Sequence, residues 1–183
     1  MIHVIKQNKN ILYSTGLPVI LIVWLVLNIG VISVFSIINF VMLLSFGYIA
    51  MICDIKTGRI PNILVLFMMA GWLLLVSAAL LMNINEKLAN LADSMFGLLI
   101  GGGMFLLVYL FSKKGLGGGD VKFMSAAGLY LGFSNTIPVI LYGTILAALT
   151  GLTLMALKII GRKDTMPLAP FLYAGILITL FTQ

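Results

Sequence analysis

The chain has 183 residues, of which 62% are hydrophobic and only 9% are charged. This composition excludes an ordinary soluble domain and indicates a polytopic helical membrane protein. The net charge of +6 does not indicate nucleic-acid binding, because the basic residues are scattered between apolar runs, where they act as signals of membrane orientation. The apolar residues come in unbroken runs rather than alternating, which excludes an outer-membrane barrel.

The sequence offers few residues that could bind a metal or form a disulfide. The chain has one cysteine, Cys53, and one histidine, His3. A single cysteine excludes an intrachain disulfide and a multi-cysteine zinc site. We therefore expect neither a metal nor a cofactor.

A helix that spans a bilayer needs roughly 20 apolar residues. On this basis the sequence predicts about seven membrane segments, and hence an all-α fold. In chain order they are Ile11–Asn28, Val31–Cys53, Ile63–Met82, Ser94–Phe111, Val121–Phe133, Thr136–Ile160 and Pro167–Phe181.

The first segment, Ile11–Asn28, is interrupted by polar residues and by Pro18, and Lys6 and Lys9 precede it. These features leave two interpretations open, a signal peptide or a retained anchor helix. No small-residue cleavage site follows, so we favour the anchor. The expected organisation is an N-terminal anchor over residues 1–30 and one membrane core over residues 31–183.

Val121–Phe133 is short for a span and is either re-entrant or a full crossing. If all seven segments cross, every Lys and Arg except Lys87 lies on one face of the membrane. The positive-inside rule therefore favours seven crossings, with the amino terminus in the cytoplasm and the carboxyl terminus outside. The expected location is the inner or plasma membrane.

Two aspartates lie at the predicted cytoplasmic boundary, where carboxylates are costly and often functional. Asp54 ends a long apolar run and opens the sequence Asp-Ile-Lys-Thr-Gly-Arg-Ile-Pro-Asn, which ends at Asn62. Gly58 and Pro61 predict a loop and then a new helix. Asp54 is alternatively only part of the polar flank of a membrane segment.

The second aspartate, Asp120, follows the glycine-rich sequence 115–119 and opens a predicted helix. The loop lacks the spacing of a phosphate-binding loop, and an aspartate there repels anions, so nucleotide binding is not expected. Either Asp120 caps the helix or it has a chemical role. Two carboxyl groups that share a site suggest acid–base chemistry on water.

Together these motifs resemble the type IV prepilin peptidase family, which are intramembrane aspartyl proteases of the Gly-x-Gly-Asp type. The proline-containing sequence 167–171 before the last helix is also similar to a family segment. The resemblance implies a six-helix protease core with the added anchor. It marks the two aspartates as catalytic and the following residues as supporting the site: Ile60, Pro61, Asn62, Gly117, Gly119 and Lys122.

The implied activity is endoproteolysis that removes the basic leader from prepilin-like precursors of the Tad/Flp, competence or archaellin type at the cytoplasmic membrane face. The implied partners are the prepilin-like substrate and the lipid bilayer. Larger members carry a cytoplasmic insertion with paired cysteines for N-methylation. This sequence lacks those cysteines, so no N-methyltransferase activity is expected.

The helix dipole suggests roles for the two carboxyl groups, because it favours negative charge at a helix start and disfavours it at a helix end. On this argument Asp120 is the base and Asp54 is the protonated partner. Two other functions remain open. One is a small transporter that moves protons or cations on the same aspartates, and the other is a non-enzymatic assembly subunit of a secretion system.

Overall fold

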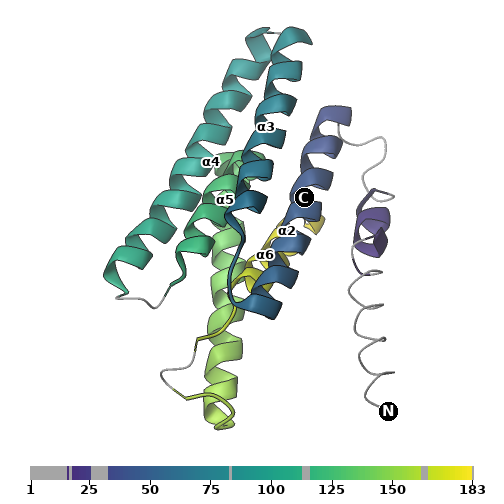
Figure 1. Ribbon diagram of the computed structural model, residues 1–183. Coiled ribbons are helices and arrows are strands. Elements are labelled where there is room, and N and C mark those ends of the chain that lie inside the picture. Colours follow the sequence, from purple (N-terminus) through teal and green to yellow (C-terminus); the bar gives the residue numbers. More distant parts are fainter. Residues whose placement is uncertain are drawn as a thin grey trace.

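The computed structural model describes residues 16, 18–25, 33–82, 84–112, 116–161 and 165–182. Within these residues the protein is helical and contains no strand, which confirms the all-α fold. The helices form one elongated bundle (Figure 1). They are α2 (Val34–Thr57), α3 (Asn62–Met82), α4 (Ile84–Phe111), α5 (Gly118–Ala156) and α6 (Ala169–Phe181).

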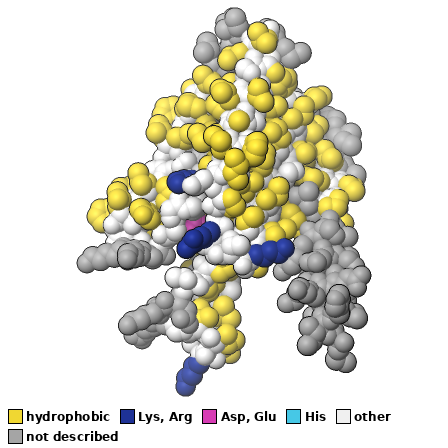
Figure 2. Space-filling model, in the orientation of Figure 1, with side chains coloured by type: hydrophobic (Ala, Val, Ile, Leu, Met, Phe, Trp, Pro, Cys, Tyr) yellow, Lys and Arg dark blue, Asp and Glu magenta, His cyan; other side chains and the backbone are white. Residues whose placement is uncertain are grey.

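The outer surface of this bundle is hydrophobic. Among the described residues, α2, α3, α5 and the Leu91–Phe111 part of α4 are long and apolar enough to cross a membrane, and α6 is a shorter apolar helix. Many large apolar side chains point outward, such as Leu74 at 71% exposure and Leu66 at 61%. Figure 2 shows this surface in yellow, with the dark-blue Lys and Arg side chains in the middle and lower parts of the view. A polytopic membrane protein is thereby confirmed.

Helix α5 reverses direction at Gly132, whose φ of 71° and ψ of −179° are not helical. In a straight helix, Met124 and Thr136 would lie about 18 Å apart. Both instead lie against Gly101 of α4: a Cβ built there would be 2.5 Å from the Met124 carbonyl oxygen and 3.4 Å from Thr136 Cγ2. The two halves therefore run in opposite directions, as the predicted segments Val121–Phe133 and Thr136–Ile160 require. With α2, α3, α4 and α6 they form a six-helix core.

The reversal is held by Asp93 of α4. Its Oδ1 accepts a hydrogen bond of 3.1 Å from the backbone N–H of Phe133, the first residue after Gly132. A Cβ at Gly132 would collide with the same carboxylate. Close contact between Gly97 and Gly128 brings α4 and the first half of α5 together.

Half of the predicted anchor Ile11–Asn28 lies outside the described residues, as do His3 and the predicted cytoplasmic amino terminus. Residues 18–25 are helical, as the anchor requires. From this helix Trp24 donates a long hydrogen bond of 3.4 Å to the Leu180 carbonyl oxygen and packs edge-on against Phe40. The proposed domain boundary at residue 30 is not described and stays a prediction.

Candidate active site

Asp54 lies in the last turn of α2 and is only 7% exposed. The helix ends at Gly58, which has a φ of 62° and donates its backbone N–H to the Asp54 carbonyl oxygen at 2.8 Å. Glycine reaches this left-handed conformation without the penalty that a Cβ imposes. The chain then turns directly into α3, as the sequence predicted, and Asp54 faces inward at the end of the bundle.

Asp120 lies in the first turn of α5. Gly117 precedes the helix in an extended conformation, and a Cβ built on Gly117 would be 2.9 Å from Asp120 Oδ2. Asp120 Oδ1 is a buried oxygen that no described protein group reaches with a hydrogen bond. The glycine-rich segment therefore lets backbone pass close to one carboxylate oxygen and leaves the other unpaired.

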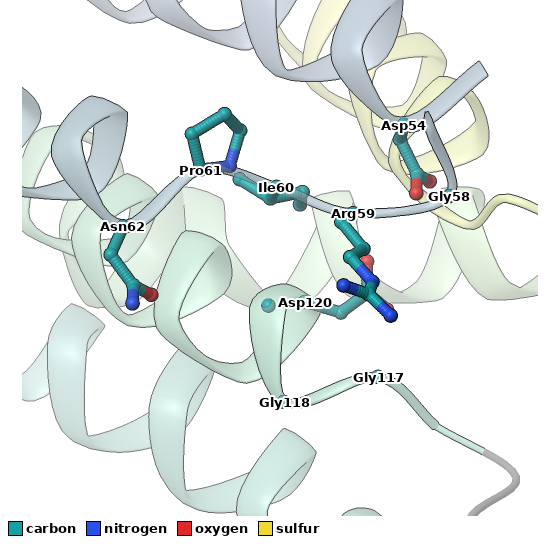
Figure 3. Close-up of a pocket in the computed structure, with 10 residues that line it drawn as sticks. Asp54, Gly58, Arg59, Ile60, Pro61, Asn62, Gly117, Gly118 and Asp120 are labelled. Atoms are coloured by element: carbon teal, nitrogen blue, oxygen red, sulfur yellow. The ribbon is translucent and has the colours of Figure 1, made fainter. Parts of the chain in front are cut away.

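The two carboxyl groups share one pocket of about 560 Å³ at this end of the bundle. They lie close enough for their charges to repel each other. Figure 3 shows Asp54 and Asp120 entering the pocket from separate helices, with Arg59 between them on the α2–α3 connection. The pocket is lined by Asp54, Gly58, Arg59, Ile60, Pro61, Asn62, Gly117, Gly118, Gly119 and Asp120.

Two contacts join the α2–α3 connection and the start of α3 to the start of α5, which carries Asp120. Gly119 packs on Ile60, so that a Cβ built at Gly119 would be 3.3 Å from Ile60 Cβ. Lys122 donates a hydrogen bond of 2.9 Å from Nζ to Asn62 Oδ1. The residues expected to support the site therefore come together, with Pro61 and Gly117 also in the pocket wall and Lys122 just outside it.

A third element also reaches the site. The backbone N–H of Ala169, the first residue of α6, donates a buried hydrogen bond of 3.0 Å to Asp54 Oδ2. Sequence reasoning missed this contact, although it singled out the proline-containing sequence 167–171. It also missed Arg59 as a pocket residue, although Arg59 lies inside the Asp54–Asn62 motif.

Metal binding finds no ligand set here. Within the described part of the chain, no group of three or more His, Cys, Asp or Glu side chains is placed to hold a metal ion. The polar side chains that line the pocket are two carboxyl groups, one guanidinium group and the Asn62 amide.

The chain is similar to known proteins over most of its length. Residues 41–152, which include both Asp54 and Asp120, match the model of the type IV leader peptidase family. The chain is 31% identical over 134 residues to the prepilin leader peptidase/N-methyltransferase of Burkholderia pseudomallei (strain 1026b), covering 70% of this chain and 41% of that protein. It is 31% identical over 137 residues to the protein of the same name from Escherichia coli (strain K12), covering 70% and 56%.

A smaller relative is covered more completely. Leader peptidase HopD of Salmonella typhimurium is 29% identical over 143 residues, which cover 74% of this chain and 86% of HopD. The chain thus spans about half the length of the prepilin leader peptidase/N-methyltransferases that it matches, and most of HopD. No solved structure matches the chain.

Proposed function

Because the chain belongs to the type IV leader peptidase family, we propose that it is an aspartyl endopeptidase that removes the basic leader from prepilin-like precursors. The observation that carries this proposal is the pairing of Asp54 and Asp120. They are 66 positions apart in the sequence, come from different helices, and line one pocket. If Asp54 were only part of a polar flank and Asp120 only a helix cap, nothing would require the two carboxyl groups to line the same pocket.

The pairing suits hydrolysis of a peptide bond. One carboxyl group must be ionised to take a proton from water, and the other must be protonated to polarise the scissile carbonyl group. Mutual repulsion between two nearby carboxyl groups favours this singly protonated state, because both cannot easily carry charge. The pocket is open to solvent at the end of the bundle, so water can enter without exposing backbone to lipid.

The supporting residues are proposed to hold this geometry. The packing of Gly119 on Ile60 and the hydrogen bond from Lys122 to Asn62 hold the start of α5 against the start of α3. Such fixed spacing matters, because small displacements of catalytic groups cost large factors in rate.

The site is proposed to face the cytoplasm, with the amino terminus inside and the carboxyl terminus outside. The described basic residues near the aspartates support this orientation by the positive-inside rule, namely Lys56, Arg59 and Lys122. The substrate would then enter from the bilayer by its apolar helix, and its leader would lie on the cytoplasmic side.

The proposal covers the peptidase step alone. Some relatives are named for N-methyltransferase activity as well, but the matched region spans about half of their length. The expected absence of N-methylation in this protein stays a prediction, as do the substrate types named from the resemblance.

The test uses the purified full chain in detergent or nanodiscs with a prepilin-like protein from the same genome. Cleavage at the junction between the basic leader and the apolar helix, located by mass spectrometry, is the expected result. Proton or cation flux in liposomes without any cleavage would instead identify a transporter. A lack of both would leave the assembly-subunit interpretation and refute the proposed activity.

A further inference from the structure

We propose that the backbone N–H of Ala169 is a positioning group that holds Asp54 as the ionised general base, which leaves Asp120 as the protonated acid. This inference rests on the proposed peptidase function and assigns the roles within that site.

The first observation is the environment of Asp54. Its side chain is 7% exposed, and burial alone disfavours a charged carboxylate. The Ala169 N–H is donated to Asp54 Oδ2 at 3.0 Å, also out of solvent. A buried N–H donor stabilises the ionised form over the neutral form. The donor also comes from the first turn of α6, where the helix dipole adds positive potential.

The second observation is the environment of Asp120. Its Oδ1 is buried without a hydrogen-bond partner among the described residues, whereas no oxygen of Asp54 is in that condition. A buried oxygen that carries negative charge without a donor is costly. A protonated Asp120 avoids that cost and has an O–H to donate to the carbonyl oxygen of a substrate.

This assignment is the reverse of the one that the sequence alone suggests. In sequence, Asp54 lies at the end of α2, where the helix dipole disfavours negative charge, and Asp120 lies at the start of α5, where the dipole favours it. The contribution of α6 is not visible in the sequence, because 115 positions separate Asp54 from Ala169. With α6 present both carboxyl groups lie at a helix start, and each has a backbone donor, Ala169 for Asp54 and Gly117 for Asp120. The difference that remains is the buried Oδ1 of Asp120, which lacks a partner among the described residues.

Among the described residues, the charged groups placed around Asp54 come from α5 and from the α2–α3 connection. Asp120 faces it from α5 and repels it, and Arg59 lines the same pocket from the α2–α3 connection. Lys122 of α5 is engaged with Asn62 Oδ1. On α6 the next titratable side chain is Tyr173, one turn after Ala169, and it packs edge-on against Tyr48.

The reaction follows from these roles. Asp54 takes a proton from water while the water oxygen bonds to the scissile carbonyl carbon, and Asp120 gives its proton to the carbonyl oxygen. In the resulting diol intermediate, Asp120 takes back a proton from one hydroxyl group as the carbonyl re-forms. The C–N bond breaks at the same time, and Asp54 gives its proton to the leaving nitrogen. Both carboxyl groups end in their starting states.

The experiment removes the N–H of Ala169 and leaves every side chain unchanged, although the ester also weakens the Leu168 carbonyl oxygen as the acceptor for Phe171 and Leu172. Ala169 is replaced by its α-hydroxy acid in cell-free synthesis of the full chain, so that an ester stands in place of the amide. The matched control is the same change at Phe171, whose N–H bonds to the Leu168 carbonyl oxygen in the same turn of α6. The readout is kcat/KM for leader cleavage as a function of pH, which reports the ionisation of the free enzyme.

We expect the Ala169 ester to move the acidic limb of this profile to higher pH by about one unit, because the charged base has lost its donor. The Phe171 ester should leave the limb in place. An acidic limb that coincides in the two ester proteins would overturn the inference. Absence of cleavage by the wild-type protein would instead refute the proposed function, so the two failures are distinguishable.

A second measurement covers the case in which the Ala169 ester does not fold. In the wild-type protein, carboxyl-labelled aspartates are titrated by NMR, with Asp54→Asn and Asp120→Asn used only to assign the signals. The Asp54 signal should show the ionised form at the lower pH. The opposite order of ionisation would overturn the assignment.

Discussion

Asn62, the first residue of α3, and Lys122, near the start of α5, are joined by a hydrogen bond of 2.9 Å between Oδ1 and Nζ. The two residues are 60 positions apart, and each lies close in sequence to one of the connections that form the pocket. The bond therefore ties the α2–α3 connection after Asp54 to the segment that carries Asp120.

The first prediction concerns this bond. Lys122→Met and Asn62→Leu should each lower the cleavage rate several-fold, because the starts of α3 and α5 are no longer held together. Thermal stability in detergent should fall by less than about 1 kcal/mol, since the pair is exposed. The double variant should lose little more activity than the worse single variant, because both changes remove the same interaction.

Lys158→Met is the matched control for the loss of a lysine, because Lys158 follows α5 and does not line the pocket that holds Asp54 and Asp120. An equal loss of cleavage in this control, or fully additive losses in the double variant, would show that the bond does not position the site.

The second prediction concerns the contact between Gly119 and Ile60. A Cβ at Gly119 would be 3.3 Å from Ile60 Cβ and 3.4 Å from Ile60 N, so Gly119→Ala is tight and Gly119→Val forces the two connections apart. We expect about a tenfold loss of cleavage rate for Gly119→Val, which corresponds to about 1.4 kcal/mol in the activation barrier. Gly119→Ala should lose less.

The control for this series is Gly103→Ala, because nothing lies within 4 Å of a Cβ built at Gly103. It should cleave at the wild-type rate. Activity of Gly119→Val equal to that of Gly103→Ala would contradict a spacing role for Gly119.

The third prediction concerns the reversal of α5. Gly132→Ala should destabilise the fold by roughly 1–3 kcal/mol through backbone strain, because this combination of φ and ψ is open almost only to glycine. Collision of the new Cβ with Asp93 adds to the loss. Asp93→Ala should cost roughly 0.5–2 kcal/mol, since Phe133 N–H loses its acceptor.

Thermal denaturation in detergent measures both effects, with Gly103→Ala as the reference for a glycine substitution in an open position. Gly132→Ala with wild-type stability would mean that α5 does not reverse at this residue.

The sequence predicted the membrane helices well, because length and apolar composition decide them. It separated Val121–Phe133 from Thr136–Ile160 correctly, although a single helix, α5, runs through both with a reversal between them. The residue responsible, Gly132, gave no distinct signal, because its role depends on Asp93 about 40 positions earlier. Such a contact arises only when α4 and α5 are packed together.

The candidate site was likewise predictable only in those parts that have a local sequence signal. Asp54 and Asp120 stood out because a carboxylate at the end of an apolar run is rare. The contacts between Lys122 and Asn62 and between Ala169 and Asp54 are long-range, and no local pattern encodes them. The acid–base assignment that we propose uses the second of these contacts, which the local dipole argument did not include.

The central claim is that the carboxyl groups of Asp54 and Asp120 act together on one peptide bond. Its most direct test is the cleavage of a prepilin-like substrate by Asp54→Asn and Asp120→Asn, with Asp93→Asn as the control. Asp93 lies at the Gly132 reversal, about 18 Å along α5 from Asp120, and an asparagine there can still accept the Phe133 N–H.

We predict that both site variants fold, bind the substrate and lose cleavage by at least about a thousandfold, while Asp93→Asn cleaves at the wild-type rate. Undiminished cleavage by either folded site variant would contradict the account.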